Sequence, residues 1–241
     1  MKNSAIEWCE NTINWYMGCT KVSEGCKNCY MYRLMKRFGK DPYILNKMNF
    51  QNIEKNLQKW QPSKIFVNSM SDTFHDELTF EQIDEMFKLM FNYDKHTYII
   101  LTKRILRAKE YFDITPCPQN FWIGTSVESE KYMSRIEVLK SIPSGVRFVS
   151  FEPLLEKINS LILDGIQWVI VGGESDPNPR PMYEDYAINI FNECQKLGIP
   201  YFFKQWGGKT KCKCHNAWGC RIFRGKTWDE YPTMAKPMIV R

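Results

Sequence analysis

The chain has 241 residues and a mass of 28.7 kDa, enough for one large domain or two small ones with a sizeable core. Apolar residues make up 44%, aromatic residues 15% and charged residues 25%, which excludes a disordered tail and a disulfide-held miniprotein. No apolar run approaches the roughly 20 residues that span a bilayer, so no membrane partner is expected. The first residues lack the apolar stretch of a secretory signal, which predicts a cytoplasmic protein.

Nine cysteines are the least ordinary part of this composition. Thiols stay reduced in the cytosol, and a core of this size needs no disulfides to hold it together. Metal or redox chemistry is therefore the leading explanation for them. The net charge of +6 is compatible with nucleic acid or another anionic partner, although a solvated basic surface would give the same value.

In chain order, short β-branched and aromatic runs alternate with helical patterns. A first strand is expected within residues 12–17, and six clearer runs follow at 64–69, 97–102, 121–127, 146–151, 167–172 and 200–204. Repeated strand and helix units with nearly continuous apolar strands predict a parallel sheet covered by helices. About seven such units are expected, fewer than the eight of a closed barrel. The predicted fold class is therefore α/β, with a partial (β/α) barrel over residues 1–208 and an irregular C-terminal tail over 209–241.

Three helices between these strands are predicted from local signals. Thr79 and Gln82 have the spacing of a capping box and would begin the helix that follows the second strand. Apolar residues at helical spacing over 187–197 end at Gly198, a typical C-terminal stop. A short helix is also expected at residues 155–162. Its apolar positions would be Leu155, Ile158 and Ile162.

Polar side chains follow each predicted strand, where chemistry collects in parallel α/β folds. They include Asn68, Ser69, Ser71, Asp72, Ser126, Glu128, Glu152, Glu174 and Lys204. Such groups in succession favour a polar site, although each acidic residue could instead cap a helix. We expect Glu128, Glu152, Glu174 and Lys204 to line one mouth, where the lysine compensates the repulsion between carboxylates. Glu128, Glu152 and Lys204 are the candidate catalytic residues.

Cys19, Cys26 and Cys29 form a C-x6-C-x2-C pattern after the first predicted strand, before a helix that carries Tyr30, Leu34 and Met35. A structural zinc site is normally closed by four ligands, whereas a 4Fe-4S cluster on three thiolates leaves one iron open to an external ligand.

Other interpretations of these cysteines remain open. Zinc is the alternative if Cys9 or His75 supplies a fourth ligand. Cys26 and Cys29 alone would suit a thioredoxin-like redox pair, and inert buried thiols are the least specific explanation.

A second group of cysteines lies in the tail. Cys212, Cys214 and Cys220, with His215 or Cys194 as a further ligand, form a candidate second metal site. Zinc and an iron–sulfur cluster both accept thiolates, so both remain open. Ordinary thiols without a metal are the equally weighted alternative.

Several motifs together resemble the phage-associated, three-cysteine, radical SAM-like family. They are Gly18-Cys19-Thr20-Lys21-Val22-Ser23 with Gly25-Cys26-Lys27-Asn28-Cys29-Tyr30, then 66–75, 101–104, 124–128, 150–154, 172–175 and 202–207. The resemblance covers about residues 6–208 and 227–232. It implies a partial barrel of radical SAM type that holds a 4Fe-4S cluster on Cys19, Cys26 and Cys29, with S-adenosylmethionine (SAM) on the open iron. The interval between the first two cysteines is longer than in the commonest radical SAM motif, C-x3-C-x2-C.

The resemblance also implies roles for the polar residues. Asn68, Ser69, Ser71 and Asp72 would bind the methionine end of SAM. Ser126, Glu128 and Glu152 would face the sugar and the substrate, with Glu174 also at the cofactor. Reduction by a flavodoxin or ferredoxin would cleave SAM and start radical chemistry on a nucleic acid or nucleotide.

A non-catalytic iron–sulfur or zinc protein that binds nucleic acid is the alternative function. A fourth thiolate from Cys9 would close the cluster and exclude SAM. The sequence contains no P-loop, dinucleotide-binding GxGxxG or HExxH zinc-protease motif. It has only three histidines and no G-x-S-x-G motif around a serine, so a serine hydrolase is also poorly supported.

Overall fold

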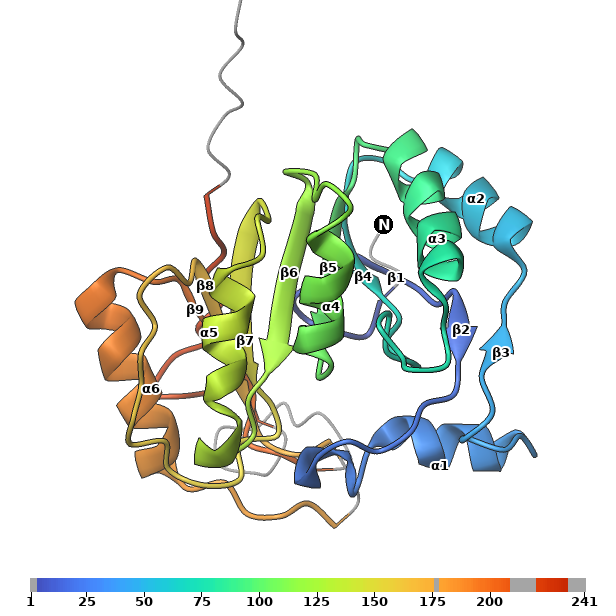
Figure 1. Cartoon of the computed structure of the whole chain (residues 1–241). Helices are drawn as coiled ribbons and strands as arrows, with labels where there is room; N and C mark the ends of the chain where they lie inside the picture. The colour runs from blue at the N-terminus through green and yellow to red at the C-terminus, as the bar shows by residue number, and fades with distance from the viewer. Residues whose placement is uncertain (1–3, 176–177, 209–219, 234–241) are drawn as a thin grey trace, which may run out of the picture.

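The computed structural model describes residues 4–175, 178–208 and 220–233, and its central feature is a curled parallel sheet (Figure 1). The strands are β1 (Asn11–Ile13), β4 (Lys64–Val67), β5 (Thr97–Thr102), β6 (Phe121–Ser126), β7 (Val146–Phe151), β8 (Trp168–Gly172) and β9 (Tyr201–Gln205). They lie in the order β1-β4-β5-β6-β7-β8-β9, and every neighbouring pair is parallel. The sheet forms a half-barrel, which confirms the α/β class and is compatible with the partial barrel that was predicted.

Helices connect most of the strands. They are α1 (Tyr30–Arg37), α2 (Phe50–Lys59), α3 (Phe80–Asn92), α4 (Ile105–Phe112), α5 (Ser134–Lys140) and α6 (Glu184–Leu197). The predicted capping box is present at the start of α3, where Thr79 and Gln82 each accept a backbone N–H of the other. Gly198 ends α6 in the left-handed conformation, at φ 67°, as a C-terminal glycine can without steric cost.

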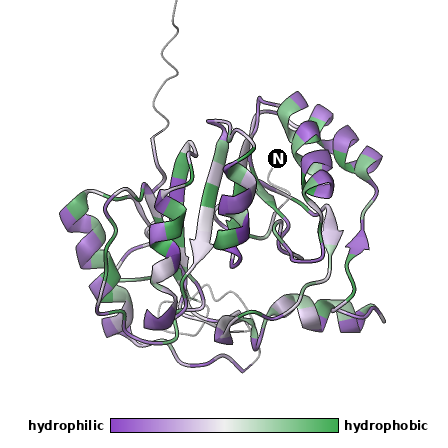
Figure 2. Ribbon diagram, in the orientation of Figure 1, coloured by the Kyte–Doolittle hydropathy of each residue, from purple (hydrophilic) through white to green (hydrophobic). Residues whose placement is uncertain are grey.

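Side chains alternate between the two faces of the sheet, and this alternation determines which residues lie on the inner face of the half-barrel. The face toward the helices carries residues such as Ile65, Ile100 and Val169 in the larger core. The inner face of the half-barrel is filled by a second, aromatic-rich core. Its buried members are Trp8, Cys9, Phe66, Ile99, Trp122, Val146, Phe148, Trp168, Ile170 and Phe202. Further along the same inner rows, toward the carboxyl ends, the sequence changes to polar residues, and Figure 2 shows this patterning along the ribbon.

The helix predicted at 155–162 is wrong, and β7 connects to β8 without a helix. Backbone amides in this segment donate to partners outside it instead of to carbonyls one turn earlier. The Leu155 amide donates to the carbonyl of Glu128 at 2.9 Å, and the amides of Asn159 and Ser160 donate to the Glu130 carboxylate. The apolar residues of this segment have helical spacing, but the segment forms an irregular loop that buries Ile158.

The strand expected within 12–17 is split into two. β1 joins the main sheet, whereas β2 (Tyr16–Met17) pairs antiparallel with β3 (Asn46–Lys47) in a small ribbon. Between β1 and β2, the Trp15 amide donates to the Asn68 side chain at 2.8 Å. This contact with a residue far along the chain diverts the backbone away from the sheet.

Part of the segment predicted as a tail packs against the domain. Phe223 is fully buried in the larger core, and the Phe203 amide donates to the Trp228 carbonyl at 2.9 Å. The indole of Trp168 donates to the Glu230 carbonyl at 2.8 Å. Among the residues that the structure describes, no helix has both the length and the apolar character to cross a membrane.

Candidate functional site

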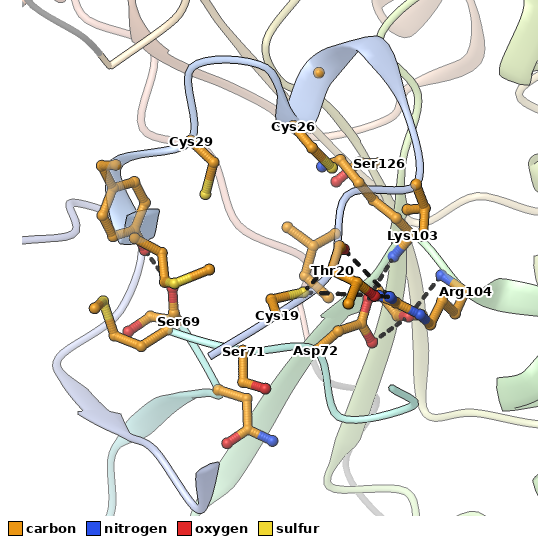
Figure 3. A pocket seen from close by; sticks show the side chains of 18 of the residues that line it. Cys19, Thr20, Cys26, Cys29, Ser69, Ser71, Asp72, Lys103, Arg104 and Ser126 are labelled. Atoms are coloured by element: carbon orange, nitrogen blue, oxygen red, sulfur yellow. Dashed lines mark hydrogen bonds and ion pairs between the residues drawn. The ribbon is translucent and has the colours of Figure 1, made fainter. Parts of the chain in front are cut away.

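A cavity of about 170 Å³ opens at the carboxyl ends of β4, β5 and β6 (Figure 3). Its polar lining includes Cys19, Thr20, Cys26, Cys29, Asn68, Ser69, Ser71, Asp72, Thr102, Lys103, Arg104 and Ser126. The structure thus brings the three cysteines of the C-x6-C-x2-C pattern together with the 68–72 segment and with Ser126. This is the end of the sheet at which the strand-end residues were expected to meet.

The three cysteines approach the cavity from one loop. Cys26 ends a short 3-10 helix (Glu24–Cys26), and Cys29 is the N-cap of α1, so both lie in the turn that opens this helix. Cys19 follows β2 and has a free thiol, as do the other two. Figure 3 shows their side chains around the same space, with Cys26 and Cys29 on one side and Cys19 on the other, near Ser71 and Asp72.

Burial raises the pKa of the Cys19 thiol to about 12, and the neighbouring Asp72 carboxylate contributes in the same direction. Burial also raises the pKa of Cys29. An activated redox thiol has a lowered pKa, since the thiolate is the nucleophile. Cys19 and Cys29 are therefore held as neutral thiols in the absence of a ligand, and a bound metal would stabilise both as thiolates.

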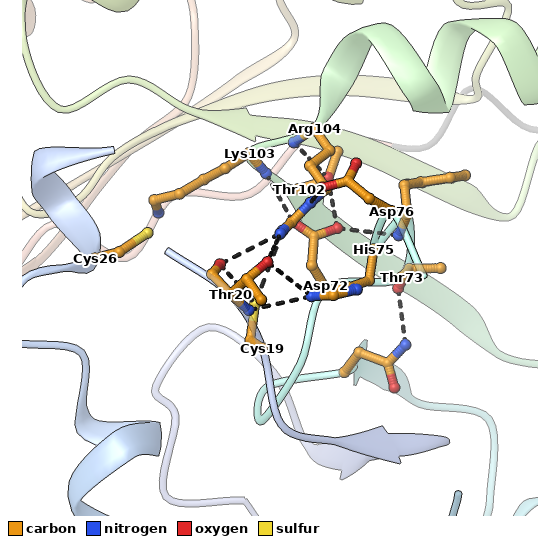
Figure 4. A network of polar contacts seen from close by, with 12 residues as sticks. Cys19, Thr20, Cys26, Asp72, Thr73, His75, Asp76, Thr102, Lys103 and Arg104 are labelled. Carbon is orange, nitrogen blue, oxygen red and sulfur yellow. Dashed lines mark hydrogen bonds and ion pairs between the residues drawn. The ribbon is translucent and has the colours of Figure 1, made fainter. Parts of the chain in front are cut away.

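Arg104 is fixed beside Cys19 by a network of polar contacts (Figure 4). Its Nη1 donates to the Cys19 Sγ at 3.7 Å and to the Asp72 Oδ2 at 3.4 Å. Its Nε donates to the Asp76 Oδ2 at 3.0 Å, and its Nη2 donates to the Thr20 Oγ1 at 2.7 Å. The guanidinium is thus a buried, preorganised donor to one sulfur of the site.

Asp72 and His75 support this arrangement from the loop after β4. Asp72 accepts hydrogen bonds from the Thr102 Oγ1 at 2.7 Å and from the Lys103 amide at 3.1 Å. The His75 Nε2 lies 3.1 Å from the Thr20 amide, whose hydrogen bond it accepts. Asp72 therefore ties β5 to the loop, and His75 supports the backbone next to Cys19 rather than lining the cavity.

The rest of the segment predicted to bind the methionine end of SAM divides into two kinds of residue. Asn68 has a positive φ of 58° and uses its side chain within the fold, accepting from Trp15 and donating to Thr73. Ser69 donates to the Asn14 side chain at 3.3 Å. By contrast, the Ser71 hydroxyl is buried at the cavity with no hydrogen-bond partner among the described residues. Of this segment, Ser71 best fits a contact with a ligand, because a buried hydroxyl without a partner is unfavourable.

Glu128 is fully buried and holds the cysteine loop in place. Its Oε1 accepts from the Ser23 Oγ at 2.7 Å and lies 3.2 Å from the Lys103 Nζ, while its Oε2 lies 3.0 Å from the Arg135 Nη1. Gly25 packs directly on it, since a Cβ there would lie 2.5 Å from the Glu128 Cγ. These contacts join the cysteine loop to β5 and α5, and they occupy the carboxylate.

Glu174 anchors the same loop from the other side. It is 4% exposed, and its Oε2 accepts from the Asn28 side chain at 2.8 Å and from the Arg180 amide at 2.9 Å. The Arg180 side chain also forms an ion pair with it. Burial by itself would raise the pKa of Glu174. The hydrogen bonds and charge of Arg180 and the hydrogen bond from Asn28 outweigh this effect, so the net pKa lies below its ordinary value.

This lowered pKa predicts a pH-dependent stability. The folded state holds the Glu174 carboxylate more firmly deprotonated than the unfolded chain, so its stabilising effect is complete above the ordinary pKa of 4.5 and is lost as pH falls through the folded pKa. Urea unfolding from pH 7 to pH 3 should show the difference between wild type and Glu174→Gln shrinking in acid. Glu184→Gln, at an exposed position, is the control; a difference independent of pH would contradict the assignment.

Glu152 and Lys204 form a separate ion pair, 2.8 Å between Oε1 and Nζ, at the same edge of the sheet. Ser150 donates to the Glu152 Oε2 at 3.1 Å, and Gly172 gives the carboxylate room, since a Cβ there would lie 2.8 Å from Oε1. Burial lowers the pKa of Lys204, but the Glu152 charge more than offsets this, so the pKa is raised and the lysine stays charged. The expected proximity of these two residues is observed, outside the set that lines the cysteine cavity.

The candidate second metal site falls largely outside the described residues, which exclude Cys212, Cys214 and His215. Cys220 is buried and its Sγ accepts from the Ile222 amide at 3.3 Å, while Cys194 is fully buried on α6. Within residues 4–175, 178–208 and 220–233, no three His, Cys, Asp or Glu side chains are grouped so as to hold a metal ion. Cys9 lies in the inner core and, among the described lining residues, does not belong to the cavity.

No individual role was predicted for Ser23 or Tyr30, and Lys103 and Arg104 were expected only as polar residues after a strand, although all four contribute to the site. Tyr30 lines the cavity and its hydroxyl donates to the Ser69 carbonyl at 2.5 Å. The sequence feature that could have identified two of them is the adjacent pair Lys103 and Arg104, directly after the buried strand β5. Because successive side chains point in different directions there, Lys103 reaches Glu128 while Arg104 reaches Cys19.

Comparison with known proteins gives a family. Residues 3–232 match the family described as "Protein of unknown function (DUF5131)", and the chain therefore belongs to it. Neither the curated proteins nor the solved structures gave a match.

Proposed function

We propose that this member of the DUF5131 family is a radical SAM-like iron–sulfur enzyme, with a 4Fe-4S cluster on Cys19, Cys26 and Cys29 and SAM bound beside it. The observation that supports the proposal is the meeting of three thiols from one loop in a single cavity. That cavity lies at the carboxyl ends of a parallel half-barrel sheet.

Three thiols suit a 4Fe-4S cluster that leaves one iron open to an external ligand, whereas a structural zinc site is normally closed by four ligands. All three thiols line one cavity, and neither Cys9 nor His75 is among its described lining residues. A ligand on the open iron would therefore lie within this cavity.

Several residues of the chain would act on such a centre without contacting a substrate. Arg104 donates to the Cys19 sulfur, and hydrogen bonds to cluster sulfurs help to set the reduction potential. Glu128 and Glu174 hold the loop through Ser23 and Asn28.

Other residues are placed to contact the remaining ligands. The buried Ser71 hydroxyl lines the cavity and would hydrogen-bond the polar methionine end of SAM, and Ser126, which lines the same cavity, would face its sugar. When bound, the reduced cluster would supply the electron that cleaves SAM and starts radical chemistry. The Glu152 and Lys204 pair, further along the same edge, would face a nucleic acid or nucleotide substrate, and a flavodoxin or ferredoxin would deliver the electron.

Anaerobic isolation followed by iron, sulfide and zinc analysis is the first part of the test. We expect iron and sulfide in near-equal amounts and little zinc. Reduction with dithionite in the presence of SAM should then yield 5'-deoxyadenosine. Stoichiometric zinc without sulfide would contradict the cluster. An intact cluster that gives no 5'-deoxyadenosine, and whose electron spin resonance SAM leaves unchanged, would favour the non-catalytic, nucleic-acid-binding alternative.

A further inference from the structure

The positive charge of the chain is concentrated around the cysteines. Residues 18–47, from the glycine before Cys19 to the end of β3, contain seven Lys or Arg and two Asp or Glu, a net charge of +5. The other 211 residues contain 26 basic and 25 acidic residues, a net charge of +1. The cysteine segment therefore carries nearly all of the excess charge, and residues 19–31 of it contribute to the lining of the cavity. Figure 1 shows its helix α1 beyond the carboxyl ends of the strands.

The same segment exposes aromatic and aliphatic side chains. Phe38 is 67% exposed, Ile44 59% and Tyr43 50%. Basic side chains on either side of them in the sequence are also exposed. We call the surface formed by Lys36, Arg37, Phe38, Lys40, Tyr43 and Ile44 the α1 face. Exposed rings among cations differ from an ordinary solvated basic surface, because burying a ring against a partner is favourable.

The α1 face is attached to the backbone of the site. The rings of Tyr43 and Tyr32 lie 5.2 Å apart between centroids, and the Tyr32 hydroxyl donates to the Cys19 carbonyl at 2.7 Å. The Cys19 amide in turn donates to the Pro42 carbonyl at 2.9 Å. A partner bound to the α1 face would therefore lie at the edge of the cysteine cavity.

The two acidic residues of the segment do not neutralise this surface. Glu24 pairs with Lys131, at 3.0 Å, on the side of the loop next to α5. Asp41 accepts the Tyr43 amide at 2.9 Å and so shapes the loop that presents the ring. In the described part of the chain, Lys36, Arg37 and Lys40 make no ion pair with a carboxylate.

We propose that the α1 face binds single-stranded nucleic acid at the edge of the cavity. The cations would contact phosphates while Phe38 and Tyr43 stack on unpaired bases, the combination by which single strands are bound without sequence preference. An acidic protein would pair with the cations, but its charge would not account for the exposed rings of Phe38 and Tyr43. The proposal rests on the proposed function in one respect, since it names single strands as the substrate class of that site.

The first test measures binding to the full-length protein by fluorescence anisotropy. The probes are labelled DNA and RNA single strands of about 12 nucleotides, in the range of known single-strand sites, and the matching duplexes. We expect tighter binding of the single strands. Phe38→Ala and Phe38→Ala/Tyr43→Ala should weaken it, the double variant by about tenfold or more, since each stacked base contributes about 1–3 kcal/mol. Tyr183→Ala, another exposed ring, should not. Equal affinity for duplexes, or equal loss in Tyr183→Ala, would overturn the proposal.

The second test uses charge. Replacing Lys36, Arg37 and Lys40 with Gln should reduce the slope of log affinity against log salt by about 2, because each phosphate contact on a single strand contributes about 0.7. Lys55→Gln/Lys59→Gln/Lys88→Gln, exposed on α2 and α3, is the matched control, and an equal change there would overturn the proposal.

Iron content and 5'-deoxyadenosine formation, measured on the same proteins, separate the two proposals. If the protein binds single-stranded nucleic acid at the α1 face but holds no iron–sulfur cluster, the proposed enzymatic function is wrong and the proposed binding surface is supported. If the protein cleaves SAM but does not bind single-stranded nucleic acid, only the proposed binding surface is wrong.

Discussion

Replacing Cys19, Cys26 or Cys29 singly with Ala is expected to remove most of the iron from anaerobically prepared protein. The three thiols are the only Cys side chains that line the cavity among the described residues. Losing one would leave two thiolates and a second open position, and a cluster held by two thiolates is readily lost. Iron and sulfide per chain, with the charge-transfer absorption of the cluster, measure the effect.

Cys117→Ala is the matched control for this prediction. Cys117 is half-buried and packs against the larger core. Its replacement removes a thiol of similar burial that is not among the residues lining the cavity. The control should retain the wild-type iron content. If all four variants lose iron alike, or if the three cavity variants keep it, the ligand assignment is wrong.

Glu128→Ala is expected to be the most destabilising substitution at the strand ends. It removes a fully buried carboxylate and leaves two cations, Lys103 at 21% and Arg135 at 12% exposure, without their partner. Removing one partner of a fully buried ion pair costs about 3–5 kcal/mol, which is the upper bound here. It also frees Ser23, so that the cysteine loop loses an anchor. Urea denaturation gives the loss in the free energy of unfolding, and the rate of iron removal by a chelator reports on the loop.

Glu152→Ala is the informative comparison. The Glu152 side chain is 12% exposed and pairs with one lysine, whereas Glu128 is fully buried and pairs with two cations, so solvent compensates more of the pairing lost at Glu152. We expect a clearly smaller loss of stability, and unchanged iron release, because the partners of Glu152 in the described part of the chain are Ser150 and Lys204, outside the cysteine loop, whereas Glu128 binds Ser23 within it. Equal losses for the two variants would contradict the distinction between an anchor and a residue that faces the substrate.

The local sequence determined the elements of the half-barrel. The apolar runs that begin at residues 97, 121 and 146 are strands, because a strand buried on both faces needs nearly continuous apolar residues. The capping box at Thr79 and the glycine at 198 mark helix ends, since both satisfy backbone groups within a few residues. The position of Cys26 and Cys29 in a turn before a helix followed from local spacing in the same way.

Contacts between distant segments decided the rest. The segment 155–162 has helical spacing but forms a loop, because Glu130 accepts its backbone amides. Thr12 to Met17 divides between two sheets, because Asn68 accepts the amide of Trp15.

The tertiary structure also decided what each strand-end residue does. The sequence predicted Glu128, Glu152 and Glu174 as one row of carboxylates, yet each has a different partner set. Glu128 is covered by two cations and a serine, Glu174 binds Arg180 and Asn28, and Glu152 pairs with a lysine. Period-2 alternation places a side chain on one face of a sheet, and a position directly after a strand places it at the carboxyl edge. Whether its charge is consumed there or left for a ligand depends on side chains from other elements, which local spacing does not specify.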